Sequence, residues 1–234
     1  MTIFPITKVP TTIPGLTCWF DAFDTPTGAV ASWSDKSGKK NHATQATGSQ
    51  QPICTANQLS GKNTLLFTGS SSQTLVLPST VYSIPNGNNT TFVVAKRSTE
   101  DGNLVFPLFL TQMDVSSTHH VAFSAVAGRI LYRNNGSSVN LISDGNTNTN
   151  YQIITGMHNG STQSLAVDNR AATTDSSGGD TSATNMAHIG SAQGTAFFLT
   201  GGIAEIIIYN KALSASQIID MKRYLGNKWG IIVP

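Results

Sequence analysis

The side chains best suited to bind a ligand gather where one expected strand ends and the next loop follows. They are Tyr132, Arg133, Asn134 and Asn135, followed by Asn146 and Asn148. Sugar binding needs an aromatic platform together with amide or charged partners on a rim. This group supplies a ring, a guanidinium and several amides, so it is the candidate ligand site. The same residue types are also common in turns, and a purely structural role is the alternative.

Asp35 is the candidate metal ligand. It lies in the polar segment 33–38, and carboxylate oxygens are what Ca²⁺ needs. The segment lacks a second and a third carboxylate, which favours the alternative of an Asx turn that accepts local backbone N–H groups. Segment 175–180, with an aspartate at each end, is a second calcium candidate of the same kind. Calcium is therefore the one cofactor that the sequence leaves open.

Catalytic carboxylates are hard to find. Glycoside hydrolysis needs two carboxyl groups that flank the scissile bond. Glu100 and Glu205 are far apart, and neither has an acidic neighbour two or four positions ahead. Asp21 and Asp24 stand at odd spacing, which would turn them to opposite faces of a strand. We expect a protein that is not an enzyme, with Glu205 as a buried or rim hydrogen-bond acceptor.

The composition narrows the partners further. Charged residues make up 11% of the 234-residue chain, against about 25% in a typical soluble domain. A formal net charge of +2 without a basic stripe argues against nucleic-acid binding. The sequence shows no secretory signal and no apolar run of membrane-spanning length. A polar, weakly charged surface suits contacts with sugars and proteins.

Short runs rich in Val, Ile, Phe, Tyr and Thr predict an all-β domain that positions these residues. The expected strands are 16–23, 64–67, 74–77, 90–96, 104–110, 121–125, 129–133, 151–158, 162–168, 186–190 and 202–210. Asn159-Gly160 predicts a hairpin between two of them. In the last strand, alternation places Ile206 and Ile208 on one face and Glu205 on the other.

One helix is expected near the C-terminus. Ser214 and Gln217 have the spacing of a capping box, and an apolar face follows from Ile218 onward. Gly226 occupies the position where a left-handed cap would end the helix.

The remaining features concern organisation. Residues 1–14 contain three prolines and predict an extended arm, either loose or docked on a neighbouring subunit, before one domain over 15–234. Cys18 and Cys54 are expected to be free and buried, although a disulfide stays open.

Three segments together resemble the concanavalin A-like lectin/glucanase superfamily, in its laminin-G-like branch. The opening strand at 16–24 is followed at 33–43 by a loop similar to the family's W-x-D-x-S-G-x-x-N-x-A pattern. Segment 59–69 resembles the strand that carries F-x-G. Segment 202–218 resembles the closing strand and short helix, with Lys211 for the usual Arg and Gln217 for the usual Glu. The resemblance implies a two-sheet antiparallel jelly-roll sandwich with one short C-terminal helix.

The resemblance extends to laminin-G-like domains of bacteriophage virions. It implies a non-catalytic structural or adhesion protein on the virion surface, such as a decoration, fibre or tail component. Its partners would be other virion subunits, bound through the arm or a sandwich face in a homo-oligomer or array, and host-surface glycans. The alternatives are a free, extracellular carbohydrate-binding lectin-like module and, third, a glycoside hydrolase of the same fold.

Overall fold

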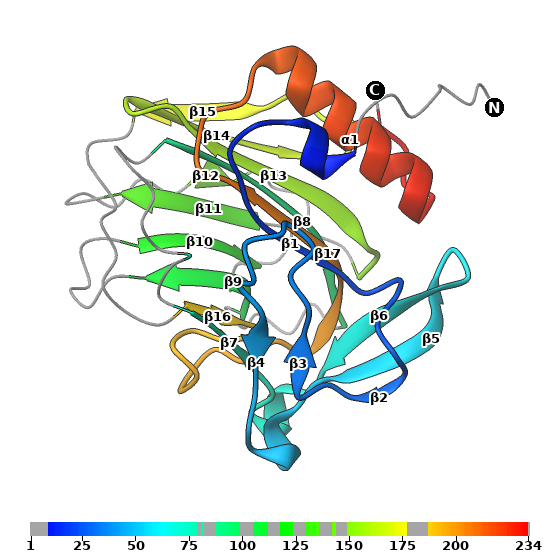
Figure 1. Ribbon diagram of the computed structural model, residues 1–234. Helices are drawn as coiled ribbons and strands as arrows, with labels where there is room; N and C mark the ends of the chain where they lie inside the picture. The colour runs from blue at the N-terminus through cyan, green and yellow to red at the C-terminus, as the bar shows by residue number, and fades with distance from the viewer. Residues whose placement is uncertain are drawn as a thin grey trace.

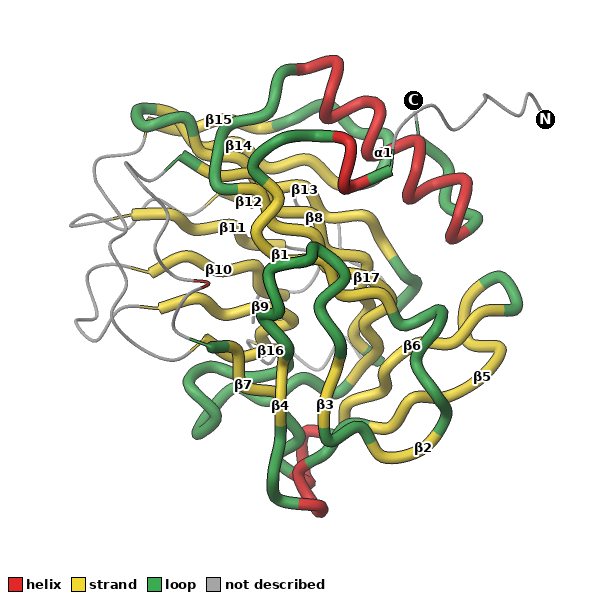
Figure 2. The backbone as a smooth tube through the Cα atoms, viewed as in Figure 1, coloured by secondary structure: helices red, strands yellow, loops and turns green. Residues whose placement is uncertain are grey.

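The computed structural model describes residues 9–78, 81, 88–98, 105–111, 118–123, 130–135, 142–143, 149–176 and 187–233. Within these residues the chain forms two antiparallel β-sheets that pack face to face, with one α-helix against the outer face of the first sheet (Figure 1). Most of the described backbone is strand or loop (Figure 2). The predicted fold class, an all-β sandwich with a single C-terminal helix, is confirmed.

The first sheet has nine strands among the described residues. In spatial order they are β15 (Thr173–Ser176), β14 (Thr162–Val167), β13 (Gln152–His158), β8 (Asn89–Arg97), β17 (Gly201–Tyr209), β6 (Lys62–Phe67), β5 (Ile53–Leu59) and β2 (Gly28–Ala29), while β1 (Leu16–Asp21) also pairs with β17. Strand β17 is central. Its first residues pair with β6 and its last residues pair with β1, so β1 and β6 share one edge of β17.

The second sheet has eight strands in the part of the chain that is described. Their order is β12 (Ile142–Ser143), β11 (Ile130–Asn135), β10 (Thr118–Phe123), β9 (Val105–Thr111), β16 (Ala187–Ile189), β7 (Leu75–Leu77), β4 (Ala43–Thr44) and β3 (Ser32–Trp33). Short 3-10 turns of the described chain, η1 (Pro10–Thr12), η2 (Gly48–Gln50) and η3 (Gly69–Ser71), join or precede the strands.

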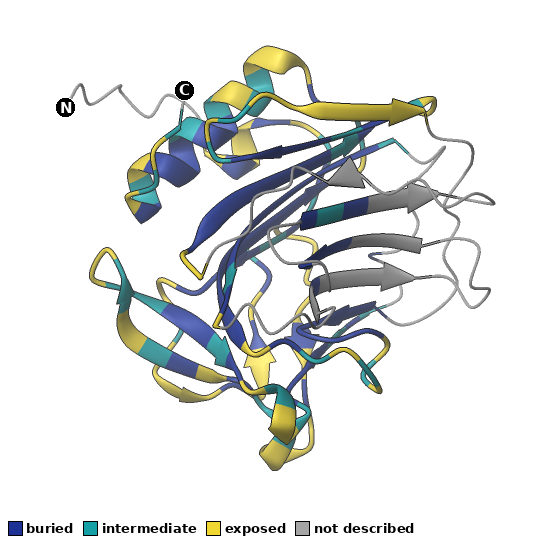
Figure 3. Cartoon of the chain, turned by 180° about the vertical axis from the view of Figure 1, so that it is seen from behind, coloured by how far each residue is buried: buried dark blue, intermediate teal, exposed yellow. Residues whose placement is uncertain are grey.

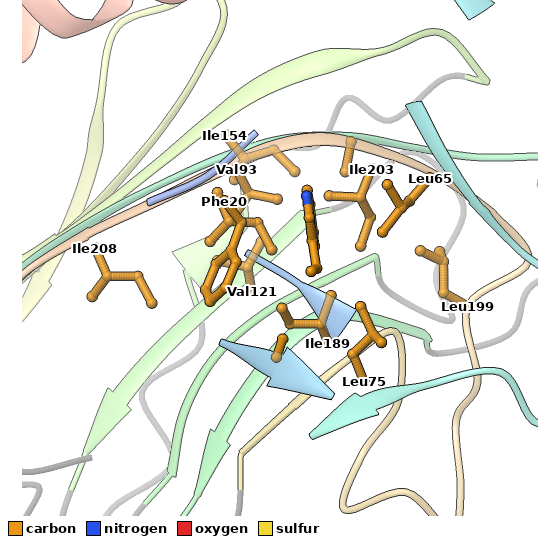
Figure 4. Close-up of a cluster of buried hydrophobic side chains, with 14 of the residues drawn as sticks. Phe20, Leu65, Leu75, Val93, Val121, Ile154, Ile189, Leu199, Ile203 and Ile208 are labelled. Carbon is orange, nitrogen blue, oxygen red and sulfur yellow. The ribbon is translucent and has the colours of Figure 1, made fainter. Parts of the chain in front are cut away.

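The core follows the alternation of β17. Ile206 and Ile208 point between the sheets, where they join Phe20, Val93 and Val121 in one apolar cluster (Figure 4). The opposite face of β17 belongs to a second cluster, which lies under the helix and includes Ile207, Tyr209, Met221, Leu225 and Trp229. Figure 3 shows how completely the central strands are buried. The predicted separation of Glu205 from Ile206 and Ile208 is confirmed.

Every predicted strand overlaps an observed one, and the predicted hairpin joins β13 to β14, with Gly160 at φ +91° in its turn. Six strands were not predicted: β2, β3, β4, β5, β12 and β15. Four of these six are two residues long, β15 is exposed throughout and β5 has a single buried residue, Cys54. None carries the apolar alternation by which a strand is recognised.

Helix α1 (Ala215–Trp229) begins with the predicted capping box. The Ser214 hydroxyl accepts a hydrogen bond from the Gln217 N–H, and the Gln217 side chain accepts one from the Ser214 N–H. The predicted end at Gly226 is wrong. The helix continues to Trp229 and ends at Gly230, which has φ +71°. Gly226 is instead a packing position, because an added Cβ would lie 2.5 Å from the Val233 side chain.

Replacing Ser214 with alanine is expected to lower the free energy of unfolding by about 1 kcal/mol, because one N–H of the first helical turn loses its acceptor. Urea unfolding of the two proteins measures the difference. Ser216→Ala is the matched control, because Ser216 lies two residues further on and its hydroxyl contacts the Ser214 hydroxyl but no backbone N–H. A Ser214→Ala protein as stable as the control would contradict the assigned cap.

The first described residues do not extend away from the domain. Pro10 and Ile13 are buried, and the Tyr209 hydroxyl donates a 2.9 Å hydrogen bond to the Pro10 carbonyl. The expected arm over 1–14 is therefore corrected for residues 9–14, which pack on their own sandwich because Ile13 completes the cluster under α1. Residues 1–8 lie outside the described residues. Cys18 and Cys54 are free and buried, as expected.

Candidate functional site

Tyr132 does not form a surface platform. It is fully buried between the sheets, and its hydroxyl donates a 2.8 Å hydrogen bond to Asn89 Oδ1. Burial raises the pKa of Tyr132 well above its ordinary value, although the Asn89 hydrogen bond opposes the shift. The register pairs Tyr132 with Val121, another core residue. The prediction that Tyr132 contacts a ligand is wrong, because its strand position turns the ring inward.

The other members of the predicted site are only partly placed. Backbone pairing joins Arg133, Asn134 and Asn135 of β11 to β10. Their side chains lie outside what the structure describes, and so do Asn146 and Asn148. A ligand role for these five residues stays a prediction.

Asp35 ties its own loop together. Its carboxylate accepts hydrogen bonds from the Trp19, Ser37 and Asn41 N–H groups at 2.9–3.0 Å and from the Ser37 hydroxyl at 2.7 Å. These contacts hold the loop after β3 against β1 and support the Asx-turn interpretation. Residues 177–180 of the second calcium candidate lie outside the described part, and no group of three or more metal-ligating side chains occurs within it.

Glu205 lies at the centre of a buried polar cluster between β17 and α1. Its Oε1 accepts from Trp19 Nε1 at 2.7 Å and from the Tyr224 hydroxyl at 3.0 Å. Its Oε2 accepts from Lys228 Nζ at 2.8 Å and from Trp229 Nε1 at 2.6 Å. Burial raises the pKa of Glu205, and Lys228 acts in the opposite direction. Four donors thus fill a carboxylate that is 0% exposed.

A chain of ion pairs leads from this cluster to the surface. Lys228 also binds Asp21 at 2.7 Å, and Asp21 lies directly opposite Glu205 in the pairing of β1 with β17. On its other side, Asp21 binds Lys36 at 2.9 Å. Lys36 binds the half-exposed Asp24 as well, and its ammonium lies 5.3 Å from the centre of the Trp19 ring.

A small cavity opens at the outer end of this chain. Its volume is about 110 Å³, and its walls are Asp21, Asp24, Thr25, Pro26, Ser32, Ser34 and Lys36. Ser32 of β3 and Ser34, which directly follows β3, flank the buried Trp33 and therefore lie on the side opposite to it. The loop after β1 supplies Asp24 and its neighbours. We call this cavity the β1–β3 pocket.

Several polar groups of the β1–β3 pocket are available to a ligand. The Ser32 and Ser34 residues are exposed, and neither hydroxyl has a hydrogen-bond partner among the described residues. Asp24 uses Oδ2 to bind Lys36, which leaves Oδ1 without a partner in the same residues. Phe23, next to Asp24 in the chain, is 48% exposed. The pocket therefore offers hydroxyls and a carboxylate oxygen, and the exposed Phe23 is next to one of its wall residues in the chain.

Sequence reasoning missed this pocket. It treated Asp21 and Asp24 as neighbours on one strand that would face apart, but β1 ends at Asp21 and Asp24 belongs to the following turn. There the alternation of a strand no longer applies, and Lys36 brings both carboxylates to one ammonium. The one available signal was the clustering of Asp21, Asp24 and Lys36 within the family's opening segment.

Comparison with solved structures shows which fold this is. Trypanosoma rangeli sialidase in complex with the inhibitor DANA matches with a TM-score of 0.64 and 13% identity over 94% of this chain. The receptor-binding domain of botulinum neurotoxin D matches with a TM-score of 0.62 and 12% identity over 93% of it. The fold is a concanavalin A-like β-sandwich.

A third structure with this concanavalin A-like fold is the binding domain of Paraclostridial Mosquitocidal Protein 1, with a TM-score of 0.63 and 12% identity over 89% of this chain. The chain spans only 34% of the sialidase, 56% of the neurotoxin domain and 52% of the mosquitocidal domain. At these identities the likeness concerns the fold alone. No family model matches the sequence, and no curated protein is a significant match.

Proposed function

We propose that this concanavalin A-like domain binds glycans without catalysing their breakdown, and that the β1–β3 pocket holds part of one sugar unit. The observation that carries the proposal is the set of polar groups in that pocket, two serine hydroxyls and Asp24 Oδ1, that have no partner among the described residues. Sugars present vicinal hydroxyls, which donate to carboxylates and exchange hydrogen bonds with hydroxyls. Their C–H faces pack on aromatic rings.

The size of the pocket sets the mode of binding. Pockets for drug-sized ligands measure about 300–1,000 Å³, whereas this one measures about 110 Å³. It would hold part of a single sugar, with the rest of the glycan lying across Phe23. Such a site binds weakly by itself, so useful avidity would require several copies of the chain.

The state of the carboxylates supports a non-catalytic role. A glycosidase needs one carboxylic acid that can give up a proton and a second carboxylate beside the sugar. All four contacts of Glu205 are to protein donors, and the side chain is fully buried. Asp21 is bound by both Lys36 and Lys228. Neither group is free to reach a glycosidic oxygen.

The structural neighbours add support of a general kind. One is named as the receptor-binding domain of a neurotoxin and another as the binding domain of a mosquitocidal protein, and the third is a sialidase that has been seen in complex with sialic acid. In all three the matched part is one portion of a longer chain. By analogy, the sandwich described here would serve as a recognition unit.

The narrower hypothesis is that the unit is a virion-surface adhesion protein that docks on other subunits and presents its loops to host glycans. Its support is the sequence resemblance to laminin-G-like virion domains and a polar surface with few charges. The alternative is a free, extracellular lectin-like module. No helix among the described residues is long and apolar enough to span a membrane.

The test is an array of immobilised glycans probed with the full chain and with two variants, Asp24→Asn and Phe23→Ala. Each variant is expected to weaken binding by about tenfold, which corresponds to about 1.4 kcal/mol. Asp175→Asn, on the exposed strand β15, and Phe197→Ala, another exposed phenylalanine, are the matched controls.

Unchanged binding by Asp24→Asn and Phe23→Ala would place the glycan site elsewhere. Absence of binding to every glycan on the array would overturn the proposal. The bound glycans are also incubated with the protein and analysed for cleavage products, whose appearance would contradict the non-catalytic role.

A further inference from the structure

The walls of the β1–β3 pocket carry an unequal set of charges. Asp21 and Asp24 contribute two carboxylates, and Lys36 contributes the single ammonium. Lys36 binds both carboxylates at once, with one contact of 2.9 Å to Asp21 Oδ2. One negative charge is therefore left over in the pocket wall, and the one cation there is already shared between two anions.

The ionisation states at neutral pH are fixed by these contacts. Burial by itself would raise the pKa of Asp21, but Lys228 and then Lys36 lower it overall. Burial by itself would lower the pKa of Lys36, but its hydrogen bonds to Asp24 and Asp21 raise it. Asp21 is thus an anion and Lys36 a cation at pH 7, so the excess negative charge persists there.

The groups behind the pocket do not change this balance. Lys228 binds Asp21 from the inner side, but it also binds the buried Glu205 at 2.8 Å. Its side chain is only 13% exposed, and it is oriented toward the two carboxylates of the protein. The Lys228 ammonium is therefore paired with Glu205 as well as Asp21 and is not available to bind a ligand.

We infer that the β1–β3 pocket selects uncharged sugars and rejects acidic ones. This inference rests on the proposed function, and it specifies the class of sugar. A neutral sugar donates hydroxyl hydrogens to Asp24 Oδ1 and exchanges hydrogen bonds with Ser32 and Ser34. A sugar carboxylate would approach Asp24 with no unshared cation to receive it, and like charges a few ångströms apart repel. The preference is opposite to that of a pocket for sialic acid, the ligand seen in the sialidase complex.

The test compares a neutral glycan with its acidic extension: lactose against sialyllactose, which carries one further, negatively charged sugar, each titrated against the full chain at low and at high salt. The neutral member is expected to bind at least tenfold more tightly at low salt. The ratio is expected to fall at 1 M salt, where the Debye length is about 3 Å. Wild-type protein that binds sialyllactose as tightly as lactose, or more tightly, overturns the inference and leaves the proposed function standing.

Two variants separate charge from shape. Asp24→Lys is expected to bring the lactose-to-sialyllactose ratio to one or below, because the pocket wall then carries an excess positive charge. Asp24→Asn is expected to give an intermediate ratio. Asp24 is half-exposed, so both variants should fold, and their melting temperatures check this. A ratio that is the same in all three proteins contradicts selection by this pocket. If no member of any glycan pair binds, the proposed function fails and the inference fails with it.

Discussion

Replacing Glu205 with alanine is expected to lower the free energy of unfolding by about 3–5 kcal/mol, the effect of removing one partner from a buried ion pair. The substitution leaves two indole N–H groups and the Tyr224 hydroxyl without their acceptor, in the buried space between α1 and β17. It also leaves Lys228 with Asp21 alone. Urea unfolding followed by tryptophan fluorescence measures the loss, and Trp19 and Trp229 report directly on the site.

Two further variants show whether the loss of stability comes from an unpaired buried charge: one is a control, and the other removes the whole ion pair. Asp175→Ala removes an exposed carboxylate from β15 and should change stability by less than about 0.5 kcal/mol. The double variant Glu205→Leu with Lys228→Met replaces the pair by apolar side chains. It should recover part of the loss, because no ammonium is left beside an empty Glu205 position and Asp21 keeps its ion pair with Lys36. Stability of Glu205→Ala within about 1 kcal/mol of wild type would contradict the role assigned to Glu205 in holding α1 on the sandwich.

The fold was predictable because its signals are local. The alternation at Ile206 and Ile208 shows which face of β17 enters the core, and the capping box at Ser214 marks where α1 begins. Both depend on neighbours within a few residues. The end of α1 was not predictable in this way. Gly226 has the residue type of a helix cap, but the turn beyond it is retained because Lys228 and Trp229 bind Glu205.

The candidate pocket depends on contacts between distant segments. Lys36 meets Asp21 and Asp24 only when the loop after β3 folds back on β1, and Asp35 fixes that loop by binding the Trp19 N–H. A single sequence does not show which of its distant segments are in contact. What it did contain was the residue set itself, within the segments that resemble the superfamily.

The prediction that Tyr132 contacts a ligand was wrong for a different reason. A local signal was present in the sequence, but it had two possible interpretations. The run Tyr132 to Asn135 is polar enough to suggest a loop rim. The direction of the ring depends on register, and the register pairs Tyr132 with the core residue Val121. Tyrosine suits such a site, because its ring fills the core while its hydroxyl reaches Asn89.

Replacing Tyr132 with alanine is therefore expected to lower the free energy of unfolding by about 3–5 kcal/mol, as for other large aromatic side chains removed from a core. The ring packs so closely on β13 that a Cβ added at Gly156 would lie 2.2 Å from Tyr132 Cδ2. Gly156 has no side chain to fill the space that the ring leaves, and a cavity would remain. Thermal and urea unfolding measure the loss, with the exposed Phe197→Ala as the control at less than about 0.5 kcal/mol.

Tyr132→Phe separates a core role from the ligand role first predicted for this residue. It keeps the ring and removes the hydrogen bond to Asn89, so it should lose about 1 kcal/mol of stability and leave glycan binding unchanged. A phenylalanine variant of wild-type stability that binds glycans tenfold more weakly would show that the hydroxyl serves a ligand. Because the hydroxyl is buried with its ring, a ligand could reach it only by separating the two sheets, and the large stability loss expected for alanine argues that they stay together.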